Sequence, residues 1–197
     1  MEPKRFTRGK GIIEPFLAKM RANKANQLIP ESLRKGRILD IGCGTYPYFL
    51  SHTYFEEKHA IDYSPKSDSV TGINWYSIDL NKNPSLPFED NYFSAITLLA
   101  VVEHLNPTSL VDLLKEGHRV LAPGGVMIMT TPAAWSDGLL KVMANLSLVS
   151  KEEIHEHVFA YSLPLLGWYF GKAGFEMTRL KFGYFEVFLN LWAVAQK

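Results

Sequence analysis

The sequence predicts an α/β fold: a Rossmann-like, mostly parallel sheet with helices on both faces. From about residue 36 onwards, short apolar runs of strand length alternate with segments whose apolar residues recur at helical spacing. Several runs end in an acidic residue or in closely spaced glycines, as strands do at the ligand-binding edge of a parallel sheet. A length of 197 residues suits a single domain of this kind.

The first 35 residues are expected to form a helical cap on this domain. Apolar residues recur at helical spacing from Ile12 to Met20, and Pro15 lies near the start, where a helix tolerates proline. We therefore expect a helix over 12–29 that ends near Pro30. The segment 4–28 also carries seven basic residues, for which the simplest interpretation is a solvated helix face: Lys4, Arg5, Arg8, Lys10, Lys19, Arg21 and Lys24.

Residues 36–131 are expected to form the cofactor-binding core of the sheet. The predicted strands cover 37–41, 58–62, 73–78, 93–99 and 126–131. A helix is expected over 108–121, because its leucines recur at helical spacing. The stretch 122–125 reads Ala-Pro-Gly-Gly and places proline and glycine where a type II turn prefers them.

The last third of the chain departs from this alternation. Residues 132–160 are expected to be an amphipathic insertion on the substrate side. In 161–197 we expect a final helix over 162–172, with Ser162 as its N-cap and Gly174 just past its end. Two strands over 176–182 and 185–195 then follow, joined by a tight turn around Gly183, so they must be antiparallel.

Composition and charge exclude several classes of protein. Lys and Arg number 21 and Asp and Glu number 20, and the resulting net charge of +1 argues against a dedicated nucleic-acid binder. A single cysteine, Cys43, excludes intrachain disulfides and argues against a cysteine-based zinc site. The polar N-terminus and the lack of an apolar run of about 18 residues predict no signal peptide and no transmembrane segment. We therefore expect a soluble, cytoplasmic protein.

A glycine-containing loop is the sharpest local feature. The strand over 37–41 runs through Asp40 into Gly42-Cys43-Gly44, and glycines there let the backbone turn sharply and approach a ligand closely. Asp62 follows Gly42 by 20 residues at the end of the next strand, a spacing at which a carboxylate meets ribose hydroxyls in nucleotide sites. Asp79 closes the third strand. Three carboxylates are therefore expected along one edge of the sheet.

Asp40 also indicates which ligand this edge prefers. A carboxylate beside the glycines is unfavourable near a pyrophosphate, and the third glycine of the dinucleotide motif is missing, because Tyr46 follows Gly44-Thr45. A ligand that carries positive charge and a ribose fits better. S-adenosylmethionine has both, in its sulfonium, its amino group and its nucleoside.

The same residues resemble the class I S-adenosylmethionine-dependent methyltransferases, especially the small-molecule branch often called type 11. The resemblance is carried by motifs in the expected order: Ile-Leu-Asp-Ile-Gly-Cys-Gly-Thr at 38–45, His-Ala-Ile-Asp-Tyr-Ser at 59–64, Leu-Pro-Phe-Glu-Asp-Asn-Tyr-Phe at 86–93, Val-Val-Glu-His-Leu at 101–105, Arg-Val-Leu-Ala-Pro-Gly-Gly at 119–125 and Ala-Gly-Phe at 173–175. It implies a seven-stranded sheet whose last strand is inserted antiparallel beside the fifth. The sequence departs from the family pattern at Tyr46, where a third glycine is common.

The resemblance also implies a set of cofactor contacts. Gly42, Cys43 and Gly44 would pack on the methionine half, with Asp40 near its amino group. Asp62 would bind the ribose hydroxyls. The adenine would be flanked by Tyr63 and bound by Asp79 and the Leu80 backbone, and Leu98 and Leu99 would lie near the reactive methyl group.

The residues that would act on the acceptor are less clearly indicated. Alignment of nucleophile, methyl group and sulfur supplies much of the rate, and a general base is needed only for a protonated acceptor. Three histidines are candidates for that base: His104, His155 and His157. The spacing of His155 and His157 does not fit the HExxH zinc motif, so no metal site is predicted.

The leading functional hypothesis is an S-adenosylmethionine-dependent methyltransferase that acts on a small-molecule acceptor and releases S-adenosylhomocysteine. An RNA or protein methyltransferase is the alternative, supported by the basic N-terminal segment. A non-catalytic member of the fold would be supported only by Tyr46. An NAD-binding oxidoreductase is opposed by Asp40 and by the missing third glycine.

Overall fold

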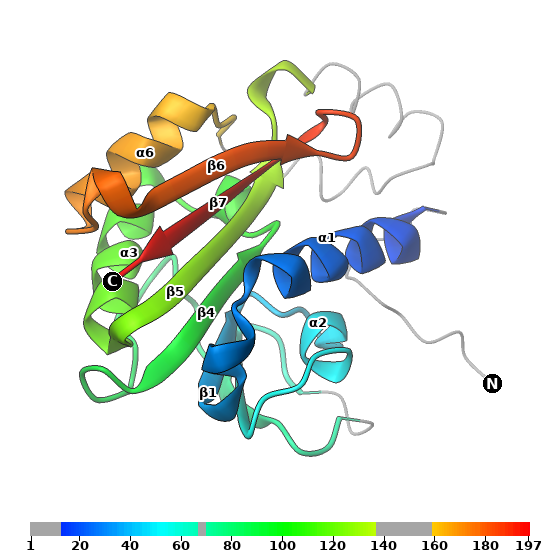
Figure 1. Cartoon of the computed structure of the whole chain (residues 1–197). Helices are drawn as coiled ribbons and strands as arrows, with labels where there is room; N and C mark the ends of the chain where they lie inside the picture. The colour runs from blue at the N-terminus through cyan, green and yellow to red at the C-terminus, as the bar shows by residue number, and fades with distance from the viewer. Residues whose placement is uncertain (1–12, 67–69, 137–158) are drawn as a thin grey trace.

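A computed structural model describes residues 13–66, 70–136 and 159–197 and shows one seven-stranded sheet in the order β3-β2-β1-β4-β5-β7-β6 (Figure 1). The strands are β1 (Arg37–Ile41), β2 (Glu57–Asp62), β3 (Asn74–Ser77), β4 (Phe93–Leu99), β5 (Leu121–Pro132), β6 (Leu180–Phe185) and β7 (Asn190–Gln196). β1 to β5 pair in parallel, and β7 is inserted antiparallel between β5 and β6. The predicted fold class is confirmed.

Helices cover both faces of the sheet, and each face carries its own apolar core. On one face pack α1 (Glu14–Leu28) and the short α2 (Tyr48–Ser51), with Ala25 and Leu50 fully buried. On the other face pack α3 (Pro107–Val120) and α6 (Leu163–Lys172), with Leu110 and Phe170 fully buried. Single-turn helices η1 (Glu31–Lys35), η2 (Val102–His104), η3 (Ala134–Ser136) and η4 (Met177–Arg179) connect the elements.

The strand order fixes where a ligand can bind. β1 pairs with β2 on one side and with β4 on the other. The strands that follow β1 are therefore added first to one side of it and then to the other, so the order of strands reverses at β1. Open α/β sheets bind ligands beyond the carboxyl ends of the strands at such a switch point. The glycine loop that follows β1 lies at this position.

The C-terminal hairpin differs from the sequence prediction. The expected turn at Gly183 is wrong: Gly183 lies inside β6 opposite Trp192, and the turn comes after Phe185. A Cβ atom at position 183 would lie 2.6 Å from the Trp192 indole. This glycine therefore permits close packing of a large ring, which the sequence pattern alone presents as a turn signal.

Two smaller expectations also change. Ser162 occupies the N-cap position of α6, but its side chain makes no capping hydrogen bond. β5 begins at Leu121, because the predicted turn at 122–125 forms an irregularity within the strand, with Gly124 at a φ of 79°. Within the described ranges no helix is both long and apolar enough to cross a membrane.

Candidate functional site

The glycine loop after β1 is shaped by its two glycines in different ways. Gly42 has a φ of 72°, and a Cβ atom there would lie 2.4 Å from Cγ2 of Val101. Gly44 has a φ of 69°, but a Cβ atom there would meet nothing within 4 Å. Gly42 is therefore required by packing, whereas Gly44 faces open space.

Asp62 ties this loop to the end of β2. Its side chain is buried, its Oδ2 accepts a 2.9 Å hydrogen bond from the Gly44 N–H, and its Oδ1 accepts a 2.8 Å bond from the Ser64 N–H. These two bonds hold the carboxylate at the carboxyl end of β2, beside the glycine loop. A carboxylate at this position fits a ligand with neighbouring hydroxyl groups.

Asp40 lies buried below the loop on β1. Its Oδ1 accepts a 2.7 Å hydrogen bond from Thr97 Oγ1 on β4. Burial raises the pKa of Asp40 to about 7, helped by the nearby Asp62 charge and opposed by the Thr97 hydrogen bond. A cationic ligand group near this carboxyl would hold it ionised. Sequence reasoning missed Thr97, although a hydroxyl near the carboxyl end of a mostly apolar strand is a visible signal.

The predicted adenine residues lie beside Asp62. The Ile78 N–H donates to the Asp62 carbonyl at 3.0 Å, which brings the chain after β3 to the end of β2. Asp79 pairs with Lys82 at 3.0 Å, and this contact lowers the pKa of the Asp79 carboxyl. Tyr63 is 59% exposed, and Leu80 is buried in the core. Of the three residues predicted to contact the adenine, Tyr63 and Asp79 therefore offer side chains to a ligand, and Leu80 offers its backbone.

The end of β4 combines a buried and a partly exposed leucine. Leu98 is fully buried, so its side chain belongs to the core, whereas Leu99 is half-buried. Ala100 follows in the left-handed region, with a φ of 56°, and its N–H donates to the Thr130 carbonyl on β5. This turn directs Val101 onto Gly42 and so joins the end of β4 to the glycine loop.

His104 and its neighbours form the segment after β4. His104 ends η2, and its carbonyl accepts a 3.2 Å hydrogen bond from Asn81 Nδ2. Two buried contacts hold the segment: Thr131 Oγ1 donates to Glu103 Oε2 at 3.1 Å, and the Tyr161 hydroxyl donates to the Val102 carbonyl at 3.1 Å. His104 is therefore held next to the loop after β3, and a base role for it stays a prediction.

His155 and His157 lie outside the described residues, as does most of the predicted insertion at 132–160. Among the residues that are described, no group of three or more His, Cys, Asp or Glu side chains is arranged to hold a metal ion.

Tyr46 replaces the glycine that is common in the resembling family. Its ring is partly buried and packs against the core under α1 and α2, and its carbonyl accepts a hydrogen bond from the Tyr48 N–H at 2.8 Å. Cys43 is half-buried and packs against the same core. The loop accommodates the larger residue by turning its ring into the core.

Comparison with known proteins relates the chain to methyltransferases. A family described as "Methyltransferase domain" matches residues 15–180. Three curated relatives named probable tRNA methyltransferase 9B, from Bos taurus, Mus musculus and Homo sapiens, are 28% identical over 109 residues. That match covers 54% of this chain, which spans about a quarter of the length of these relatives (23–24%).

Solved structures share the fold over nearly the whole chain. A SAM-dependent methyltransferase from Archaeoglobus fulgidus superposes with a TM-score of 0.67 at 16% identity, covering 91% of this chain and 94% of that one. A possible histamine N-methyltransferase from Thermotoga maritima gives 0.67 at 18% identity, covering 90% and 87%. A putative methyltransferase in complex with the Haloferax volcanii Trm112 activator gives 0.65 at 14% identity, covering 96% and 98%. At these identities the likeness concerns the fold.

Proposed function

Because the chain belongs to the methyltransferase-domain family that its sequence matches over residues 15–180, we propose that it transfers a methyl group from S-adenosylmethionine to a small-molecule acceptor. One observation carries the cofactor assignment: at the switch point of the sheet, Gly44 faces open space, and its N–H is bonded to the buried carboxyl of Asp62, while the buried Asp40 lies on the strand that leads into the same loop. At this edge of the sheet a ligand can approach the loop backbone closely and meet carboxylates, and both features suit a nucleoside that carries positive charge.

Each part of the cofactor has a matching group in this arrangement. The methionine half is assigned to the loop backbone at Gly42, Cys43 and Gly44, which it can approach closely. The Asp40 carboxyl is assigned to its amino group. Asp62, held at the end of β2 by the Gly44 and Ser64 N–H groups, is assigned to the ribose hydroxyls. The adenine is assigned to the exposed Tyr63 ring, the Asp79 carboxylate and the Leu80 backbone.

The chemistry of transfer comes from the cofactor, whose sulfonium supplies an activated methyl group. The chain binds and orients the reactants, and good alignment is worth roughly 7–11 kcal/mol of the barrier. Leu98 and Leu99 end the strand that faces the reacting atoms. His104, His155 and His157 remain the candidates for a base where the acceptor carries a proton.

A tRNA acceptor is the second candidate. It is favoured by the 28% identity to the curated tRNA methyltransferase 9B relatives and by the basic residues of α1. The near-zero net charge supports the small-molecule acceptor, because phosphate binding draws on clustered Lys and Arg.

Calorimetric titration with S-adenosylmethionine and S-adenosylhomocysteine tests the cofactor site. We expect stoichiometric binding that weakens at least tenfold in Asp62→Ala, which removes a carboxylate that can accept several hydrogen bonds. Asp112→Ala on α3 is the matched control, because Asp112 is exposed and forms a surface ion pair with Lys115. A folded protein that binds neither ligand would contradict the proposal.

Release of S-adenosylhomocysteine then separates the two acceptor classes. The protein is incubated with S-adenosylmethionine and either a small-molecule panel or total tRNA, at low and at high salt. Turnover confined to the small-molecule panel supports the first candidate. Turnover on tRNA that falls steeply as salt rises supports the second.

A further inference from the structure

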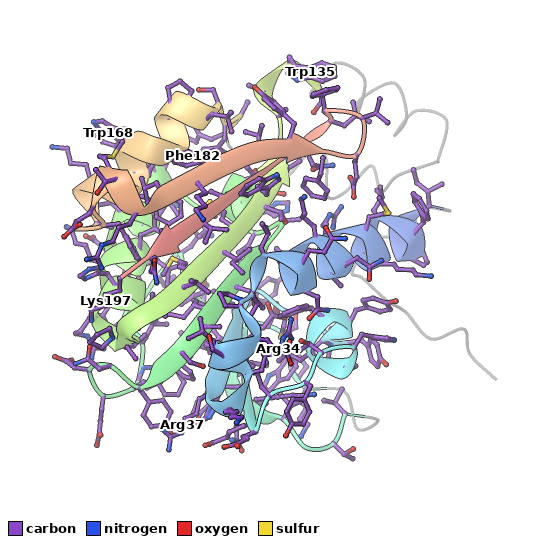
Figure 2. All side chains as sticks on the ribbon, viewed as in Figure 1. Arg34, Arg37, Trp135, Trp168, Phe182 and Lys197 are labelled. Carbon is purple, nitrogen blue, oxygen red and sulfur yellow. The ribbon has the colours of Figure 1, made fainter. Side chains whose placement is uncertain are left out.

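Asn81, in the loop after β3, connects two segments that strand pairing does not bring together. β3 and β4 are not neighbours, because β2 and β1 lie between them in the sheet. The loop 79–83 follows β3 and the segment 102–109 follows β4, so both lie beyond the carboxyl ends of the strands. In Figure 2 this edge of the sheet is marked by Trp135, just after β5, and the opposite edge by Arg37, the first residue of β1.

The side chain of Asn81 spans this gap with both ends of its amide. Its Nδ2 donates a 3.2 Å hydrogen bond to the carbonyl of His104, the last residue of η2. Its Oδ1 accepts a 3.1 Å bond from the N–H of Asn106, the residue before α3. A primary amide presents a donor and an acceptor side by side, so it pairs with a backbone carbonyl and N–H that lie close together. Aspartate keeps only the acceptor, and alanine keeps neither group.

The backbone of Asn81 is held on both sides as well. Its N–H donates to Asp79 Oδ1 at 3.2 Å, and its carbonyl accepts from Ser109 Oγ on α3 at 3.2 Å. The N–H groups of Lys82 and Asn83 donate to the Asp79 carbonyl at 3.1 and 2.9 Å and close the loop. Asp79 is therefore tied through Asn81 to the end of η2 and to the start of α3.

The residues that Asn81 connects include those assigned to the adenine. Asp79 and Leu80 directly precede it, and the buried Leu80 side chain belongs to the same apolar core as Val102 and Leu105. Asn81 itself is exposed, so its side chain adds no apolar burial to that core. Its hydrogen bonds therefore fix the position of the loop 79–83 more than they drive folding.

We propose that Asn81 is a positioning residue, which holds the Asp79 carboxylate in place for the amino group of adenine by fixing the loop 79–83 to the segment after β4. Hypoxanthine has a 6-oxo acceptor at this position and carries its donor one ring atom away, at N1. A carboxylate that is held in place therefore prefers adenine, whereas a carboxylate on a loosened loop can move to either donor. This inference rests on the proposed methyltransferase function.

Two ligands that differ at one position of the purine test this role. S-adenosylhomocysteine and S-inosylhomocysteine, in which a 6-oxo group replaces the 6-amino group, are titrated by calorimetry into the parent protein and each variant. We expect the parent to prefer the adenine ligand at least tenfold, and Asn81→Ala to reduce that preference to about threefold or less. Asp79→Ala should abolish the preference, because it removes the carboxylate itself.

Asn83→Ala is the matched control for the loop. Asn83 is also exposed, and its Oδ1 accepts a 3.2 Å hydrogen bond from the Ser85 N–H, so its side chain makes a local contact. This variant should keep the preference of the parent. Asn81→Asp retains an acceptor for the Asn106 N–H but loses the donor to the His104 carbonyl, so we expect an intermediate preference.

The outcomes separate this inference from the proposed function. An unchanged preference in Asn81→Ala with a normal unfolding midpoint, including an equal loss of affinity for both ligands, would overturn the positioning role. Equal binding of the two ligands by the parent, or the same loss of preference in Asn83→Ala, would also overturn it. If Asn81→Ala does not fold, Asn81→Asp decides by the same comparison. A parent protein that binds neither ligand would overturn the proposed function, and the positioning role with it.

Discussion

Thr97 on β4 donates a 2.7 Å hydrogen bond to the buried carboxyl of Asp40 on β1, directly below the glycine loop. The two strands are neighbours at the switch point of the sheet, so this bond links the two elements between which the cofactor is assigned. Burial nevertheless dominates, and it raises the pKa of Asp40 to about 7. The charge of this group therefore changes within the physiological pH range.

The first prediction is that cofactor affinity depends on pH through Asp40. If the ionised carboxyl binds the amino group of the cofactor, a pKa of about 7 leaves roughly a tenth of the protein competent at pH 6 and nine tenths at pH 8. We expect the affinities for S-adenosylmethionine and S-adenosylhomocysteine to rise about tenfold between these values. Calorimetry at both pH values measures this, and Asp40→Asn should bind weakly with little pH dependence. A pH-independent affinity in the parent protein would contradict the assignment.

The second prediction concerns stability without ligand. Because the pKa of Asp40 is raised above its unfolded value of 3.8, the folded state holds the proton more tightly, and stability is lost as pH rises from about 4 to about 7. Asp40→Asn keeps a neutral group there at all pH values. We expect it to exceed the parent in unfolding free energy by about 2–4 kcal/mol at pH 8, and by much less at pH 5. Urea unfolding at both values measures the difference, and Asp112→Asn, exposed on α3, should show no such change.

The third prediction separates the roles of the two loop glycines. Gly42→Ala places a methyl group 2.4 Å from Val101 and keeps a φ of 72°, so it should destabilise the fold by about 3 kcal/mol. Gly44→Ala bears only the backbone cost of about 1–2 kcal/mol, since its Cβ meets nothing within 4 Å. Thermal unfolding compares the two variants.

Gly44→Ala, the more stable of the two variants, should nevertheless lose affinity for the cofactor. Gly44→Ala fills the open space assigned to the ligand, so we expect it to fold and to lose S-adenosylmethionine affinity by at least tenfold. Equal affinities of Gly44→Ala and the parent would place the ligand elsewhere.

The strands and the glycine loop were predictable because they follow from local patterns. Apolar runs of strand length correctly placed β1, β2 and β4, and the acidic strand ends correctly placed Asp40 and Asp62 near one another. The order of the strands came from resemblance to a family, because apolar periodicity is the same whichever neighbour a strand pairs with.

The parts that were missed depend on contacts between distant residues. Gly183 is required by the Trp192 ring on the neighbouring strand, and no local signal distinguishes that role from a turn. Thr97 becomes a partner of Asp40 only when β4 pairs with β1.

The last prediction concerns the strained β6–β7 turn. Val187 keeps a φ of 54° although it is 85% exposed, so it gains little from burial and bears the cost of the left-handed conformation. Asparagine tolerates this conformation much better than a β-branched residue. We expect Val187→Asn to raise the free energy of unfolding by about 1 kcal/mol, measured by urea denaturation, whereas Val187→Ala should change it much less. A variant that gains no stability over Val187→Ala would show that the turn is not strained at this residue.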